Sequence, residues 1–227
     1  MCNEDDFPEM ASVIVPAFSG MALEAVNTGS PSSENIERAA GNHLKAWREH
    51  AKGFSIPSAI KCVHTDPGTG KEEIVGAAYW FIYTRERSEK EYKRPGHLFT
   101  ASWLEDEQDR MNVVACLEPM LQGRIKWMGG RPYGLLIYMA VLPEWRRKGV
   151  SIQCVQWGLE RCQELGIPAY LEASEEGAFV YKKLGFEVMD VMRSRWAGKE
   201  DTFPVMIKWP AGTREEDKRP VMPNSMA

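Results

Sequence analysis

The stretch Leu135–Ile152, LLIYMAVLPEWRRKGVSI, decides the fold because it joins a strand to a helix through a basic turn. Residues 135–142 form an uninterrupted apolar run, which is typical of a central strand that is covered on both faces. Pro143 ends this run. From Ser151 onward, apolar residues recur with the i, i+4, i+7 spacing of a helix face. The sequence therefore predicts a strand, a basic turn and a helix, in that order.

The turn between this strand and helix has the chemistry of an anion-binding site. Arg146, Arg147 and Lys148 stand next to Gly149. The start of a helix leaves backbone N–H groups without partners and carries the positive end of the helix dipole, so a phosphate is favoured there. Gly149 also lets the backbone approach a ligand closely. The turn is neither a P-loop nor a GxGxxG motif. A solvated surface turn is the simpler alternative.

Two motifs, one in this turn and one farther along the chain, together resemble a known family. Arg146-x-x-Gly149-x-Ser151 resembles the (Q/R)-x-x-G-x-(G/A) signature of the GNAT acetyltransferase superfamily, although Ser151 stands where that family has Gly or Ala. The Ser151 hydroxyl is expected to cap the helix or to contact a phosphate. Farther along the chain, residues 178–186 (AFVYKKLGF) resemble the family's A-x-x-Y-x-x-x-G-F helix and turn. The stretch from Pro168 to Phe186 looks most like uncharacterised fungal members.

The resemblance implies an α/β fold with a mixed, mostly antiparallel sheet, a splayed central strand pair, and helices on both faces. It implies acetyl-CoA as co-substrate and an amine of a small molecule or peptide as acceptor. The acetyl group would pass by direct attack in a ternary complex, without a covalent enzyme intermediate. The residues expected to bind acetyl-CoA are Met139, Ala140, Val141, Arg146, Arg147, Lys148, Gly149, Val150, Ser151, Ser174 and Ala178.

The reaction also needs an oxyanion donor, an acid and a base. A backbone N–H near the end of the central strand could bind the oxyanion, especially if a bulge frees it from the sheet. Tyr181 matches the family's leaving-group tyrosine, so we expect it to protonate the departing thiolate. Glu172, at the end of the next strand, is the candidate base, with Glu118, His97 or a water chain as alternatives.

Composition limits the class of protein. The chain has 227 residues and a net charge of −4, which leaves no basic surplus for a nucleic-acid binder. Its five cysteines form no CxxC pair, and its four histidines lack zinc spacing, so we expect reduced thiols and no metal site. No apolar run reaches transmembrane length and no signal peptide is visible, so we expect a soluble, cytoplasmic protein without membrane contact.

Residues 1–212 are interpreted as a single domain, with variable helices over 1–58, a mobile insert loop over 85–104 and a disordered tail over 213–227. The family's first strand has almost no sequence available before the first helix. Pro119 is expected to break or kink a later helix. A monomer and a homodimer are both open. Outside catalysis, the alternatives are a non-catalytic acyl-CoA-binding regulatory module and a protein-interaction domain.

Overall fold

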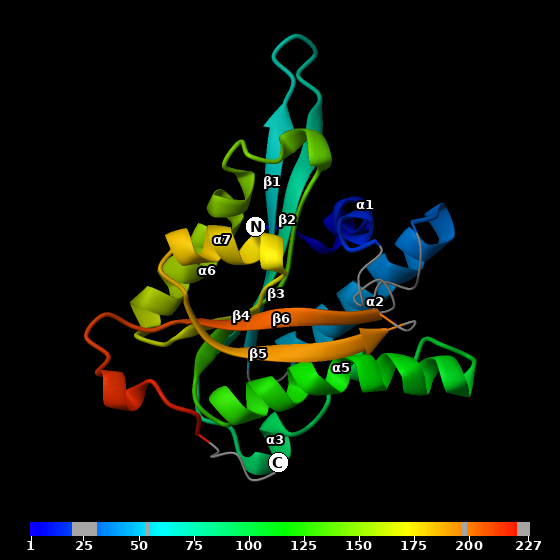
Figure 1. Ribbon diagram of the computed structural model, residues 1–227. Coiled ribbons are helices and arrows are strands. Elements are labelled where there is room, and N and C mark those ends of the chain that lie inside the picture. The colour runs from blue at the N-terminus through cyan, green and yellow to red at the C-terminus, as the bar shows by residue number, and fades with distance from the viewer. Residues whose placement is uncertain (20–30, 53–54, 197–198, 222–227) are drawn as a thin grey trace.

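The computed structural model describes residues 1–19, 31–52, 55–196 and 199–221, and a six-stranded sheet forms its framework (Figure 1). The strands lie in the order β1-β2-β3-β4-β6-β5, and β3 runs parallel to β4 while the other neighbours are antiparallel. This confirms the predicted mixed, mostly antiparallel sheet. The strands are β1 (Ser55–Thr65), β2 (Glu72–Tyr83), β3 (Tyr133–Val141), β4 (Ala169–Glu172), β5 (Glu187–Trp196) and β6 (Lys199–Lys208).

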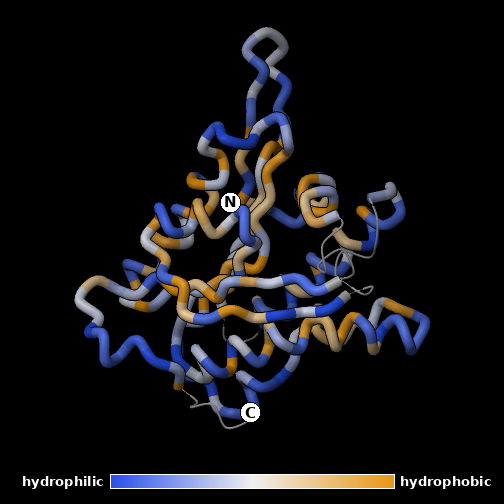
Figure 2. The backbone as a smooth tube through the Cα atoms, in the orientation of Figure 1, coloured by the Kyte–Doolittle hydropathy of each residue, from blue (hydrophilic) through white to orange (hydrophobic). Residues whose placement is uncertain are grey.

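Helices cover both faces of this sheet, as predicted. One layer holds α1, α2 and α5, and the other holds α6 and α7. The short helices α3 and α4 lie in the connection between β2 and α5. Figure 2 shows hydrophobic residues along the central strands, between the two layers. The helices are α1 (Phe7–Ala17), α2 (Ser33–Ala51), α3 (Glu89–Tyr92), α4 (His97–Thr100), α5 (Glu107–Trp127), α6 (Val150–Leu165) and α7 (Glu175–Lys183).

A close contact positions α6 on the sheet. Trp80 of β2 is fully buried, and a Cβ built on Gly158 of α6 would lie 2.1 Å from its ring. Only a residue without a side chain fits there, so α6 packs directly against the indole. This contact helps to set where α6 begins, and therefore where the basic turn lies relative to β3.

His43 of α2 lies in the core between the sheet and α1, α2 and α5. It is 2% exposed, with its ring centroid 5.3 Å from that of Tyr79 and 4.9 Å from that of Tyr138. Burial lowers the pKa of His43 to about 3. The unfolded chain, with a histidine pKa near 6.5, therefore takes up this proton at higher pH than the native protein does.

A pH-dependent stability follows from this difference. The contribution of neutral, buried His43 to the free energy of unfolding is fully present above pH 6.5. It is lost as the pH falls, and the loss is about 2–3 kcal/mol at pH 4.5. Urea unfolding of wild type and His43→Phe at pH 7 and pH 4.5 would measure it. We expect the variant to lose less stability between the two pH values than wild type. Equal losses in both proteins would contradict the assignment.

α1 lies in the region of the predicted N-terminal helices, and Pro8 is in its first turn. The Asp6 carboxylate, however, accepts hydrogen bonds from the Asn3 N–H and the Lys61 ammonium, not from the N–H groups of α1. Residues 1–6 contain a 3-10 turn and no strand, and the Cys2 N–H donates to the Ala59 carbonyl of β1 at 2.9 Å. Among the described hydrogen bonds, this is the one backbone bond that joins residues 1–6 to β1.

The break expected at Pro119 does not occur, and the kink that was its alternative stays a prediction. α5 continues through Pro119 from Glu107 to Trp127, because buried side chains on both sides of the proline, including Cys116 and Met120, hold the helix in the core. Tertiary packing therefore outweighs the hydrogen bond lost at the proline.

Residues 213–221, which belong to the segment expected to be disordered, make defined contacts in the structure. The Lys218 ammonium pairs with Glu187 at 2.8 Å, and the Val221 N–H donates to the Lys126 carbonyl at 3.0 Å. These bonds tie the segment to β5 and α5. The rest of the predicted tail, 222–227, lies outside the described residues.

Candidate active site

The site begins where β3 separates from β4. Their parallel pairing ends at Leu136 opposite Leu171. The pairing of β3 with β2 shifts register nearby, and the consecutive side chains of Ile137 and Tyr138 pack on the same face. Two successive side chains on one face mark a β-bulge. The bulge expected near the end of the central strand is therefore present, just before Met139.

This bulge decides which backbone groups face the open side of β3. The Leu142 N–H donates to the Val75 carbonyl on β2 at 3.1 Å. Because N–H directions alternate along a strand, those of Met139 and Val141 face the side that β4 has left. The N–H of Ala140 faces β2, and its side chain is buried. Of these three predicted residues, the geometry favours Met139 and Val141 as donors.

The basic turn after β3 has an unusual backbone. Arg147 has φ 61° and Gly149 has φ 84°, so both lie in the left-handed region. Such turns direct successive N–H groups toward one concavity, which suits an anion. A non-glycine residue in this region stores strain, which is typical of functional sites. α6 starts at Val150 with no side-chain cap, and Ser151 does not supply one.

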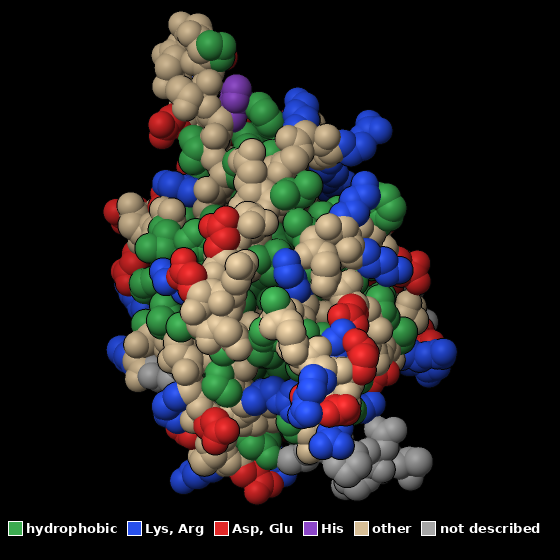
Figure 3. All heavy atoms as spheres, turned by 90° about the vertical axis from the view of Figure 1, so that its left-hand side faces the viewer, with side chains coloured by type: hydrophobic (Ala, Val, Ile, Leu, Met, Phe, Trp, Pro, Cys, Tyr) green, Lys and Arg blue, Asp and Glu red, His purple; other side chains and the backbone are tan. Residues whose placement is uncertain are grey.

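The three cations of the turn are exposed, but they lie in different surroundings. Lys148 lies over the Trp145 ring, 4.4 Å from its centroid, and His64 of β1 packs on the same ring. Arg146 leans back, and its Nε donates to the Val141 carbonyl at 3.5 Å. Figure 3 faces the side with α6 and α7 and shows Lys and Arg side chains on its upper part. The turn thus combines positive charge with uncapped helical N–H groups.

α7 carries the other predicted residues of the motif. The Ser174 Oγ caps this helix by accepting from the Gly177 N–H at 3.1 Å, and Ala178 is buried against the sheet. The Tyr181 ring is half-buried, with its centroid 5.8 Å from that of Phe186. Burial raises the pKa of Tyr181 above its ordinary value. The phenol therefore keeps its proton at neutral pH, as a proton donor must.

The candidate base is held in an ion pair. Arg124 of α5 donates from Nε and Nη2 to the two carboxylate oxygens of Glu172, both at 2.8 Å. The two side chains are only 13% and 5% exposed. This bidentate bond occupies the carboxylate and weighs against Glu172 as a proton acceptor. Among its rivals, Glu118 is exposed on α5, and the side chain of His97 lies outside those described.

A cavity of about 390 Å³ lies on the sheet face that carries α2 and α5. Its volume is in the range of small-molecule sites. It reaches Ile137, where the bulge lies and β3 leaves β4. The described lining residues are Ala46, Glu49, His50, Lys52, Phe81, Tyr83, Arg87, Glu91, Tyr92, Arg94, Pro95, Gly96, Phe99, Leu121, Arg124, Tyr133, Leu135 and Ile137.

The floor of this cavity is aromatic and cationic. The Arg87 guanidinium carbon lies 4.0 Å from the centroid of the Tyr83 ring and 5.2 Å from that of the Tyr133 ring. The guanidinium also donates a hydrogen bond of 2.8 Å to the Gly129 carbonyl. The His50 ring stacks on the Phe81 ring, with 3.7 Å between the two centroids. Burial, and then the charges of Arg124 and Arg87, lower the pKa of His50 to about 4. The same positive field acts on any cation placed in the cavity.

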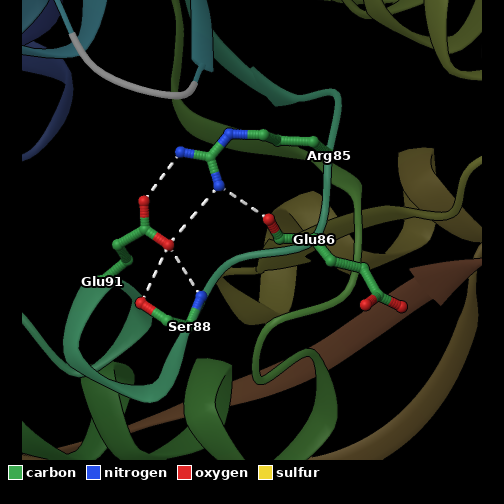
Figure 4. A network of polar contacts seen from close by, with 4 residues as sticks. All are labelled: Arg85, Glu86, Ser88 and Glu91. Carbon is green, nitrogen blue, oxygen red and sulfur yellow. Dashed lines mark hydrogen bonds and ion pairs between the residues drawn. The ribbon is translucent and has the colours of Figure 1, made fainter.

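Polar contacts connect residues within the segment that the sequence predicts as a mobile insert loop. Glu91 of α3 pairs with Arg85 at 2.7 Å and accepts from the backbone and side chain of Ser88 (Figure 4). The Arg87 N–H donates to the Gly130 carbonyl. The segment therefore contains two short helices and contributes to the cavity wall. Its mobility stays a prediction.

The sequence reasoning missed Arg87, Arg124 and His50. They come from a loop and two helices that are distant in sequence, and no motif spacing links them. The dense charge of residues 85–96 was visible in the sequence, but it indicated a solvated loop. Only folding places Arg87 in a buried position, 9% exposed, next to Arg124.

The described residues show neither a metal site nor a membrane-spanning helix. They contain no group of three His, Cys, Asp or Glu side chains that could hold a metal ion. Within them, no helix combines the length and the apolar character needed to cross a bilayer. All five cysteines carry free thiols.

Comparison with known proteins agrees with this geometry. A sequence model described as the Acetyltransferase (GNAT) family matches residues 70–186. Over 74 residues, 30% of this chain and 54% of the relative, the chain is 31% identical to "Probable acyltransferase SID5" of Ajellomyces capsulatus. The chain thus spans about half the length of this curated relative.

Solved structures share the fold. A Drosophila melanogaster polyamine N-acetyltransferase superposes with a TM-score of 0.59 at 11% identity, covering 91% of this chain and 96% of the other. A Corynebacterium glutamicum protein described as histone acetyltransferase HPA2 and related acetyltransferase gives 0.56 at 20% identity, covering 93% and 95%. At these identities, the likeness concerns the fold alone.

Proposed function

Because this chain belongs to the GNAT acetyltransferase family, whose model matches its residues 70–186, we propose that it transfers an acetyl group from acetyl-CoA to an amine. The observation that carries the proposal is that three features lie next to one another where β3 leaves β4. They are the unpaired edge beyond Leu136, the uncapped start of α6 at Val150, and a cavity that reaches Ile137. Together they offer a donor site and an acceptor site that meet.

The donor site fits acetyl-CoA. The N–H groups at the start of α6, with Gly149 and the cations Arg147 and Lys148, would bind the pyrophosphate. The open edge of β3 would bind the pantetheine arm, which carries amide groups that suit strand-like hydrogen bonds. Acetyl-CoA supplies the thioester carbonyl that is attacked. The N–H groups of Met139 and Val141 are the donors available for the oxyanion.

The acceptor amine must be neutral to attack the carbonyl carbon. A free ammonium group has a pKa near 10.4, and both desolvation and nearby cations lower it. The cavity provides both influences, as the low pKa of His50 indicates. The amine can therefore lose its proton to water before attack, without a carboxylate base.

The collapse of the tetrahedral adduct breaks the carbon–sulfur bond. The electron pair goes to the CoA sulfur, and Tyr181 would supply the proton that makes the thiol. The attacking nitrogen loses its extra proton to water, and Tyr181 regains one from solvent. No bond between enzyme and acetyl group forms in this direct transfer.

Calorimetric titration with acetyl-CoA tests the donor site. We expect saturable binding for wild type and an increase in Kd of about tenfold or more for Arg147→Ala with Lys148→Ala, because two cations near the phosphates are lost. Lys71→Ala with Lys90→Ala removes the same charge from exposed positions elsewhere and should leave the Kd unchanged.

A parallel titration with dephospho-CoA, which lacks the phosphate on the ribose, shows how much of the affinity for the cofactor comes from that phosphate. No binding of acetyl-CoA at millimolar concentration would contradict the proposal and leave an interaction domain. Binding without CoA release for any amine would instead favour a non-catalytic acyl-CoA-binding module.

A further inference from the structure

The lining of the cavity is unevenly charged. Among its described residues, cations outnumber carboxylates: the cations are Lys52, Arg87, Arg94 and Arg124, and the carboxylates are Glu49 and Glu91. Glu91 is bound by Arg85 and Ser88 at the rim (Figure 4). Glu172, which is not in the lining, pairs with Arg124 from the adjacent strand β4. The cavity therefore keeps a positive excess even after these pairs are counted.

The cavity follows β3, and Arg87 lies at one end of it. Tyr133, Leu135 and Ile137 of β3 line it in sequence, so it follows the strand for about 13 Å at 3.3 Å per residue. Arg87 lies over the Tyr133 ring, at the start of the strand. Ile137 lies at the other end, where the open edge of β3 begins. The Arg87 guanidinium thus lies at the opposite end of the cavity from the point at which the amine would react.

A simple amine is poorly matched to such a cavity. A polyamine would bring further positive charge close to Arg87, Arg94 and Lys52, and like charges in a partly desolvated site repel strongly. A carboxylate would instead form charge-assisted hydrogen bonds with a guanidinium, the donor whose geometry suits it best. The aromatic walls suit an apolar linker between the two ends.

We propose that the acceptor is a small molecule that carries both a primary amine and a carboxylate, separated by an apolar linker. The carboxylate binds at the Arg87 end of the cavity, with Arg94 of the same lining as a second cation, and the amine lies near Ile137. This inference rests on the proposed acetyl transfer and specifies its acceptor. It also explains how a positive cavity retains its acceptor while it favours the neutral amine.

Matched acid and amide pairs test this inference. The probes are aminobutanoate, aminohexanoate and aminooctanoate with the amine on the last carbon, together with their carboxamides, and the readout is CoA release. We expect kcat/KM to be about tenfold or more higher for the acid than for its amide at the best length, because the amide loses the charge-assisted bond.

Variants locate the carboxylate. Arg94 is exposed, so Arg94→Gln should fold normally and should raise KM for the best acid about tenfold, with the amide unchanged. Arg87→Gln should raise KM for the acid more than for the amide, although the loss of its charge also acts on the amine of both substrates. Lys90→Gln, an equal charge change at an exposed residue of α3 outside the lining, should alter neither substrate.

The outcomes separate this inference from the proposed function. If acetyl-CoA binds but every amide equals or exceeds its acid, or no acid is acetylated, the inference is wrong while the donor site stands. Equal changes in KM for acid and amide in the arginine variants would also overturn it. If acetyl-CoA itself does not bind, the proposed function has failed.

Discussion

Replacing Tyr181 with phenylalanine is expected to lower kcat about 100-fold, because the departing thiolate then leaves without a proton donor. The change deletes one hydroxyl from a half-buried ring that packs on Phe186, so α7 should keep its position. The Kd for acetyl-CoA should stay unchanged, since the phosphate-binding turn is not altered. Steady-state kinetics and calorimetric titration of the same preparation measure the two quantities.

A second tyrosine serves as the control. Tyr79 of β2 is 6% exposed and also carries a hydroxyl, but it lies in the opposite core, beside α1 and α2. Tyr79→Phe should leave kcat unchanged. If Tyr181→Phe turns over as fast as wild type, Tyr181 is not the acid, and a water molecule becomes the remaining donor.

Replacing Glu172 with alanine is expected to lower the free energy of unfolding by about 3–5 kcal/mol. The substitution leaves the Arg124 guanidinium, 13% exposed, without the carboxylate that accepts two of its hydrogen bonds. A buried charge without its partner is far more costly than the pair itself is favourable. Denaturant unfolding at pH 7 measures the loss.

The double variant Arg124→Met with Glu172→Leu gives the contrast. It removes both charges and keeps apolar volume, so we expect a stability within about 1–2 kcal/mol of wild type or above it. A loss below about 1 kcal/mol for Glu172→Ala would contradict the importance of the pair.

The same residue tests the predicted base. Glu172→Gln keeps the shape of the side chain and removes its charge. If Glu172 accepts the proton, kcat should fall about 100-fold and the acidic limb of its pH profile should vanish. If it only positions Arg124, as the bidentate pair indicates, the pH profile should keep its shape.

Local patterns were enough to predict the strand, turn and helix around the basic motif. The apolar run ending at Pro143 and the helical spacing after Gly149 describe neighbours in sequence, so their physics is local. The mixed, mostly antiparallel sheet and the helices on both of its faces followed from the family resemblance that the two motifs supported. These parts agree with the structure.

Predictions that depended on distant contacts were less successful. Pro119 does not break α5, because the helix is held by buried residues on both sides of the proline. Residues 213–221 pack onto β5 and α5 through Lys218 and Val221, although their composition indicated disorder. In both cases tertiary contacts outweighed a local propensity.

By itself, the sequence determined the fold family, the basic turn and the candidate tyrosine, because each depends on residues that are close together in the chain. Only the tertiary structure decided the acceptor side. It paired Glu172 with Arg124, buried Arg87 over two tyrosine rings, and placed His50 in the same cavity. The physical reason is that charge and burial in a cavity are sums over residues from separate elements, and no sequence spacing records which of them meet.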